Sequence, residues 1–71
     1  MDTLNKLVGF RFQLVKLALN SKLSKESFQE LKRNLILTNE LINRYNFEKK
    51  IDFIKLTSIE EYILKIKKLL F

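Results

Sequence analysis

Residues 4–19, with the sequence LNKLVGFRFQLVKLAL, decide the fold. On a helical wheel at about 100° per residue, the apolar side chains of this stretch cover roughly 220° of the circumference. A helix that packs on one neighbour needs an apolar arc of only about 100°. We therefore expect a helix over 3–20 that is the central one of the molecule, covered by other helices on two sides.

One charged residue interrupts this apolar arc. Arg11 falls in its middle, between Leu4, Val15 and Ala18. Two interpretations stay open: the aliphatic stem lies at the rim with the guanidinium in water, or the residue is buried and paired, because an isolated interior charge is costly. A position at an interface would reconcile them. We predict that Arg11 bonds an acidic group or a carbonyl oxygen of another helix or subunit.

The composition predicts a small all-α fold. The chain has 71 residues, which is enough for one domain spanning 1–71. It has no Pro and a single Gly, and 46% of its residues are hydrophobic, which is too many for a disordered segment. We expect a three-helix bundle with helices at about 3–20, 24–45 and 58–70, and a short fourth helix or turn near 47–55.

Polar residues mark the expected helix boundaries. Asp2 or Thr3 can cap the first helix, and the polar tripeptide at 20–22 should end it. Ser24 is a good cap for the second helix. The segment 57–61, TSIEE, contains two overlapping capping boxes, in which a hydroxyl residue precedes a glutamate by three positions. This signal predicts that the last helix begins at about 58.

No segment of the sequence predicts a membrane location. The N-terminus has no basic region that leads into an apolar run. The longest aliphatic runs, at 17–19 and 35–37, are three residues long, whereas a bilayer span takes about 20. The first helix is expected to be covered by its neighbours, so we do not expect it to lie on a membrane. These observations favour a cytoplasmic protein.

The second and third predicted helices each carry an apolar seam and some apolar residues off that seam. The second helix repeats at steps of three and four residues, and its predicted core positions are Phe28, Leu31, Leu35, Thr38, Ile42 and Tyr45. The last helix has a stripe of the same kind, at Ile59, Tyr62, Ile63, Ile66, Leu69 and Leu70.

The apolar residues that lie off these seams suggest an interface. Several exposed apolar side chains that gather in one patch usually mark a contact with another protein. We therefore predict an interface, between two copies of the chain or with a protein partner, made by Arg11, Ile36, Leu37, Leu64 and Phe71.

The residue types needed for most catalysis are absent or already explained. Without His or Cys, a nucleophile would need activation by a buried polar cluster. Glu60 and Glu61 are explained by helix capping, and Glu48 and Asp52 fit a solvated pair better than a cation site. No glycine-rich phosphate loop occurs. We expect no enzyme, no cofactor, no bound metal and no small-molecule substrate.

The positive charge suggests nucleic-acid binding as an alternative. The chain carries a net charge of +6, spread along its length without a polybasic block. Residues 13–31 loosely fit a helix-turn-helix, whose possible nucleic-acid contacts would be Lys22, Lys25, Gln29, Lys32 and Arg33. Two features count against this motif: such turns often have a glycine where this chain has Lys22, and the second helix is unusually long for one that reads a DNA groove.

The sequence thus favours a non-enzymatic helical interaction module that forms a homodimer or docks on a protein partner. The alternative is a basic, nucleic-acid-binding regulator of helix-turn-helix type. The abundance of Lys, Asn, Ile and Phe in a short chain is typical of proteins from phages, plasmids and other mobile elements, so a regulator of that origin fits either interpretation.

Overall fold

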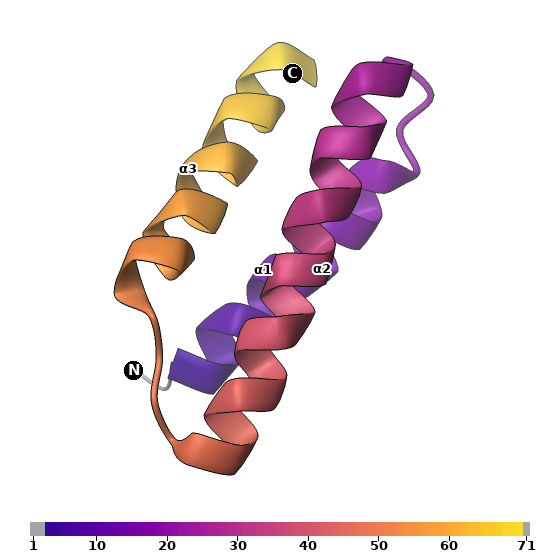
Figure 1. Cartoon of the computed structure of the whole chain (residues 1–71). Helices are drawn as coiled ribbons and strands as arrows, with labels where there is room; N and C mark the ends of the chain where they lie inside the picture. Colours follow the sequence, from indigo (N-terminus) through magenta and orange to yellow (C-terminus); the bar gives the residue numbers. More distant parts are fainter. Residues whose placement is uncertain (1–2, 71) are drawn as a thin grey trace.

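The computed structural model describes residues 3–70 and contains, within that range, three α-helices and no strand. They are α1 (Thr3–Ala18), α2 (Lys25–Glu48) and α3 (Phe53–Leu70). Figure 1 shows α1 and α2 running in opposite directions, with α3 returning beside them in the direction of α1. The predicted all-α, three-helix architecture is confirmed. None of these helices is both long enough and apolar enough to cross a membrane.

The connection between α1 and α2 is built by Asn20 and Ser24. The backbone N–H of Asn20 donates to the carbonyl of Leu17 at 3.1 Å, and its side-chain oxygen accepts the N–H of Lys22 at 2.8 Å. The hydroxyl oxygen of Ser24 then accepts the N–H of Ser27 at 3.1 Å. The predicted cap of the second helix is therefore confirmed. The cap proposed at Asp2 lies outside the described residues.

The connection between α2 and α3 differs from the prediction. Lys49 adopts the left-handed conformation, with φ 56°, and its N–H closes α2 by donating to the carbonyl of Tyr45 at 2.9 Å. The carboxylate of Asp52 then caps α3 by accepting the N–H groups of Ile54 and Lys55 at 3.0 and 3.2 Å. The short fourth helix near 47–55 does not exist, because its first residues belong to α2 and its last to α3.

The predicted start of the last helix, at about residue 58, is also wrong, because α3 begins at Phe53. Thr57 and Ser58 lie exposed within the first two turns of α3 and cap nothing. Capping boxes are local patterns, and the same spacing fits an exposed stretch inside a helix. Burial of Leu56 between the other helices favours the longer helix, because that side chain would otherwise lie in a loop.

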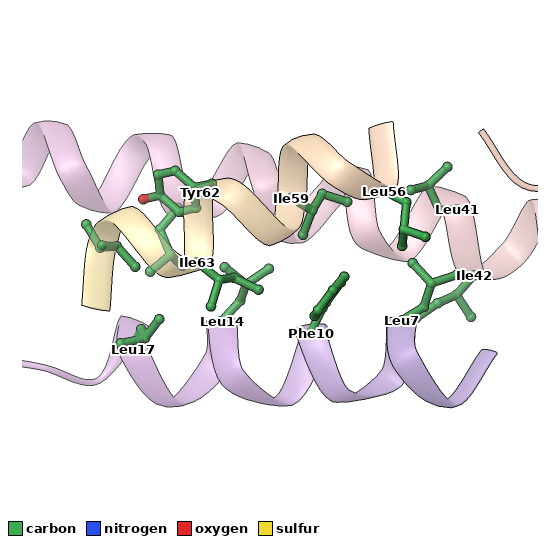
Figure 2. Packing of buried hydrophobic residues seen from close by; sticks show 12 residues of the cluster. Leu7, Phe10, Leu14, Leu17, Leu41, Ile42, Leu56, Ile59, Tyr62 and Ile63 are labelled. Carbon is green, nitrogen blue, oxygen red and sulfur yellow. The ribbon is translucent and has the colours of Figure 1, made fainter. Parts of the chain in front are cut away.

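The core lies along the axis of the bundle, where all three helices meet (Figure 2). Leu7, Leu14 and Ile59 are fully shielded from solvent, each at 0% exposure. The complete set of buried apolar residues is Leu7, Phe10, Leu14, Leu17, Leu31, Leu41, Ile42, Leu56, Ile59, Tyr62, Ile63 and Ile66. At about 25 cal/mol per Å² of apolar area, burial of this set is the main term that stabilises the fold.

The helix α1 is not the covered, central helix that its wide apolar arc predicts. Its buried residues form one narrow stripe, made of Leu7, Phe10, Leu14 and Leu17. The most extensive helix pairing is between α1 and α2, and α3 packs less extensively against each of them. Leu4 and Ala18, at the two ends of the helix, pack partly against the core. The rest of its apolar arc, at Val8, Phe12, Val15 and Leu19, faces solvent.

The seam of α2 is close to the prediction. Leu31, Thr38 and Ile42 are buried, whereas Phe28 is 41% exposed. The buried hydroxyl of Thr38 donates to the carbonyl of Asn34 at 2.8 Å, so it leaves no unsatisfied polar group in the core. In α3 the predicted core position Leu69 is wrong. It is 67% exposed.

Polar contacts tie α3 to the other two helices. The hydroxyl of Tyr62 donates to the carbonyl of Ser27, in the first turn of α2, at 3.2 Å. Burial of this phenol, and to a lesser degree the negative charge of Glu30, raises the pKa of Tyr62 above its ordinary value of 10.0. The remaining ties are exposed ion pairs, at Lys65–Glu30 and Lys6–Glu60. Such pairs add little stability in water.

Candidate functional site

The outer side of α1 carries an uncovered line of large apolar side chains. We call Val8, Phe12, Val15 and Leu19 the α1 stripe; Leu19 follows the last residue of the helix. Their exposed fractions run from 40% for Val8 to 81% for Leu19. Single exposed apolar residues are common on protein surfaces, but a continuous line of them on one helix usually marks a contact surface.

The spacing of the α1 stripe is that of a helix-pairing seam. Its members follow one another at four, three and four residues. This is the step at which one helix presents side chains to a second helix lying along it. The stripe occupies about 60° of the circumference and extends for about 16 Å, at 1.5 Å per residue. The core stripe of α1 has the complementary spacing of three, four and three, so α1 has one seam toward the core and another toward solvent.

Arg11 lies between these two seams, on the flank of α1 that faces α2. It is exposed, which excludes the buried alternative. Its Nη1 atom donates to the side-chain oxygen of Asn39, on α2, at 3.5 Å. The acceptor is thus the amide carbonyl of another helix and not a carboxylate. This long contact holds the guanidinium at the edge of the α1 stripe, with its remaining donors available to solvent.

The opposite flank of the α1 stripe also carries positive charge. The ammonium of Lys16 lies 5.7 Å from the centre of the Phe12 ring. Beside that ring, α1 and the end of α3 enclose a surface hollow of about 310 Å³ lined by Phe12, Gln13, Lys16, Leu17, Asn20 and Lys67. Within residues 3–70, neither Arg11 nor Lys16 forms an ion pair with a carboxylate.

The residues predicted as an interface do not form one patch. Ile36 is 51% exposed on α2 and Leu64 is 56% exposed on α3. The predicted interface position of Leu37 is wrong. This side chain is partly buried against the core, because α3 packs on that side of α2. Phe71 lies outside the described residues. Arg11 is on a different helix from both exposed residues, next to the α1 stripe.

Other exposed apolar residues gather less regularly than the α1 stripe. Phe47, Phe53 and Ile54 flank the connection between α2 and α3, and Leu69 lies near the end of α3. Shallow hollows accompany Phe53 and Leu64 on the outer side of α3. None of these residues continues at helix-pairing steps for more than one turn, so none offers the extended line that α1 does.

The residues predicted to contact nucleic acid are all exposed, namely Lys22, Lys25, Gln29, Lys32 and Arg33. Lys25, Gln29 and Arg33 line one surface hollow on the first turns of α2, together with Glu26 and Glu30. However, α1 and α2 lie antiparallel along their length (Figure 1). The two helices of a helix-turn-helix instead cross at roughly 90–120°. The observed pair thus differs from a helix-turn-helix, and the nucleic-acid contacts stay a prediction.

Two acidic residues have roles other than the expected ones. Asp52, which was considered with Glu48, caps α3. Glu60 lies inside α3 and pairs with Lys6 of α1 at 3.6 Å, so its predicted capping role is wrong. Over residues 3–70, no group of three or more His, Cys, Asp or Glu side chains is placed to hold a metal ion.

Comparisons with known proteins add no relative: no family model, curated protein or solved structure matches this chain.

The members of the α1 stripe belong to the wide apolar arc of residues 4–19, which predicted core positions for all of them. Apolar periodicity shows which side chains share a face, and it does not show whether a neighbouring helix covers that face. One available signal was the spacing of four, three and four residues in Val8, Phe12, Val15 and Leu19, which is separate from that of the core stripe.

Proposed function

We propose that this chain is a non-enzymatic interaction module that binds a helix of another protein, or of a second copy of itself, through the α1 stripe. The observation that carries the proposal is the exposed seam of Val8, Phe12, Val15 and Leu19 on a helix whose other side is anchored in the core. Because the fold already orders α1, binding requires little further loss of its conformational entropy.

The shape of the surface supports a helix as the bound element. A seam about 60° wide matches the apolar edge of one helix laid alongside. Insertion into a bilayer surface needs a broader apolar face. The surface is also bordered by flexible charged side chains, which resembles the polar rim of many protein interfaces.

The test uses a labelled, 21-residue helical peptide with leucine at its own seam positions and glutamine at the flanking ones. Backbone amide signals of the protein are followed by NMR during titration, and also during dilution of the protein alone. The expected result is a set of shifts centred on the α1 stripe. A titration with duplex DNA, repeated at several salt concentrations, tests the alternative function of nucleic-acid binding.

A matched pair of variants sharpens the test. Phe12→Ser removes the largest side chain of the α1 stripe, whereas Phe47→Ser removes an even more exposed ring, at 89%, from the far end of α2. Only the first should abolish the shifts. If neither peptide nor protein concentration shifts α1, while DNA shifts Lys25 and Arg33 with a steep salt dependence, the nucleic-acid function is the correct one.

A further inference from the structure

We infer that the α1 stripe is built for an acidic amphipathic helix of a different chain, and not for a second copy of this one. The inference rests on the proposed function and adds the chemistry of the partner. Its basis is the charge that borders the α1 stripe on both sides.

The helix α1 contains no Asp or Glu. Its charged residues are Lys6, Arg11 and Lys16. If the α1 stripe is taken as the seam of a pair of helices, Arg11 and Lys16 lie directly on either side of that seam. These are the two positions that contact the edges of the partner helix. Residues at these positions select the partner and the orientation of a helix pair through attraction or repulsion.

The neighbouring flank of α2 is also free of carboxylates. Asn39 marks this flank through its contact with Arg11. Steps of three and four residues from Asn39 along α2 reach Phe28, Lys32, Leu35, Asn43 and Asn46, none of which is acidic. On the other side, Lys67 of α3 closes the hollow beside Phe12. A helix lying on the α1 stripe would therefore meet positive side chains along both of its edges.

A symmetric pair of copies offers no ion pair across the α1 stripe. In a parallel pair, flanking contacts join residues five positions apart, so Arg11 of one copy would face Lys16 of the other. In an antiparallel pair that overlaps the whole stripe, Arg11 would face Ala18 and Lys16 would face Gly9 of the other copy, so the flanking positions would form no ion pair. The parallel arrangement is repulsive, and the antiparallel one leaves both charges without a partner. A partner helix with Glu or Asp at its flanking positions converts the same contacts into ion pairs.

The test compares three labelled peptides with the same leucine seam and with glutamate, glutamine or lysine at the flanking positions. The peptide is held at a low fixed concentration, and its anisotropy is measured while the protein is added. At low ionic strength we expect the glutamate peptide to bind most tightly and the lysine peptide most weakly, by roughly tenfold in Kd. Added salt should compress this difference.

Charge-reversal variants separate a local effect from the overall positive charge of the protein. Arg11→Glu with Lys16→Glu should reverse the order of the three peptides. Lys50→Glu with Lys55→Glu makes the same change in net charge at exposed positions near the start of α3 and should keep the order. Circular dichroism of each variant checks that the helices are retained.

Each remaining outcome is decisive. If the three peptides bind with equal Kd values and Phe12→Ser abolishes their binding, the proposed function stands and the acidic partner is overturned. The same conclusion follows if the protein associates with itself and Phe12→Ser abolishes that self-association. If no peptide binds, the proposed function itself fails. Binding of phosphatidylserine vesicles or duplex DNA that depends on Arg11 and Lys16, without peptide binding, would make the α1 stripe a surface for those ligands.

Discussion

Arg11 of α1 and Asn39 of α2 meet at the surface, with 3.5 Å between the guanidinium Nη1 and the amide oxygen. The acceptor is neutral, and among residues 3–70 no carboxylate forms an ion pair with Arg11. An arginine whose role was to hold α1 on α2 would be better served by a carboxylate at a shorter distance. The contact instead holds the guanidinium at the edge of the α1 stripe, where a helix lying on that stripe would meet it.

Replacement of Arg11 by methionine should leave stability almost unchanged. The residue is exposed and its bond to Asn39 is long, so the free energy of unfolding should change by less than about 0.5 kcal/mol. Urea denaturation measures this value. The same variant should bind the glutamate-flanked peptide more weakly. A large loss of stability would show that Arg11 is a structural residue.

Removal of the Asp52 carboxylate should destabilise the protein. This side chain satisfies two N–H groups at the start of α3, and loss of such a cap typically costs about 1 kcal/mol. Asp52→Ala should therefore lower the free energy of unfolding by that amount. Ser58→Ala is the control, because Ser58 is an exposed residue inside α3 and alanine favours the helix. A greater loss in Ser58→Ala would restore the cap predicted from the sequence.

The helix caps show what local sequence signals could and could not predict. Ser24 was identified correctly because it follows a polar turn and precedes Glu26, whose charge favours the first turn of a helix. Asp52 and Ser58 both have the chemistry of a cap, and the choice between them depends on Leu56, which is buried only once α3 extends back to Phe53. That burial is a tertiary effect, so no local pattern contains it.

The same limit applies to the candidate site. The wheel of α1 identified the apolar residues, but Leu14 became core and Val15 became surface because α2 and α3 approach from adjoining sides. In α2, the outward position of Ile36 followed from periodicity. The inward position of Leu37 did not, since it depends on the side from which α3 packs.

Replacement of Gly9 by alanine should stabilise the fold. Gly9 lies within α1, and a Cβ atom added there would meet no other atom within 4 Å. Glycine inside a helix is less favourable than alanine by up to about 1 kcal/mol, mainly for reasons of backbone entropy. We expect a gain of that size in the free energy of unfolding, measured by urea denaturation. A loss would mean that α1 packs more closely there than the structure shows.

The raised pKa of Tyr62 predicts a stability that falls in alkaline solution. The neutral phenol is favoured in the folded state, so its contribution is complete below the unfolded pKa of about 10 and is lost as the pH rises through the folded pKa. Tyr62→Phe should cost about 1 kcal/mol at neutral pH, through loss of the bond to Ser27. The difference between parent and variant should shrink above pH 10. A constant difference would mean that the phenol titrates normally.

The most direct measurement is an isotope-filtered NOE spectrum of the labelled protein with the unlabelled glutamate-flanked peptide. If the α1 stripe is the binding surface, the peptide leucine methyls will show intermolecular NOEs to the Phe12 ring and to the methyls of Val8 and Val15. Binding with NOEs to Ile36 or Leu64, and none to Phe12, would contradict the assignment of this surface to α1.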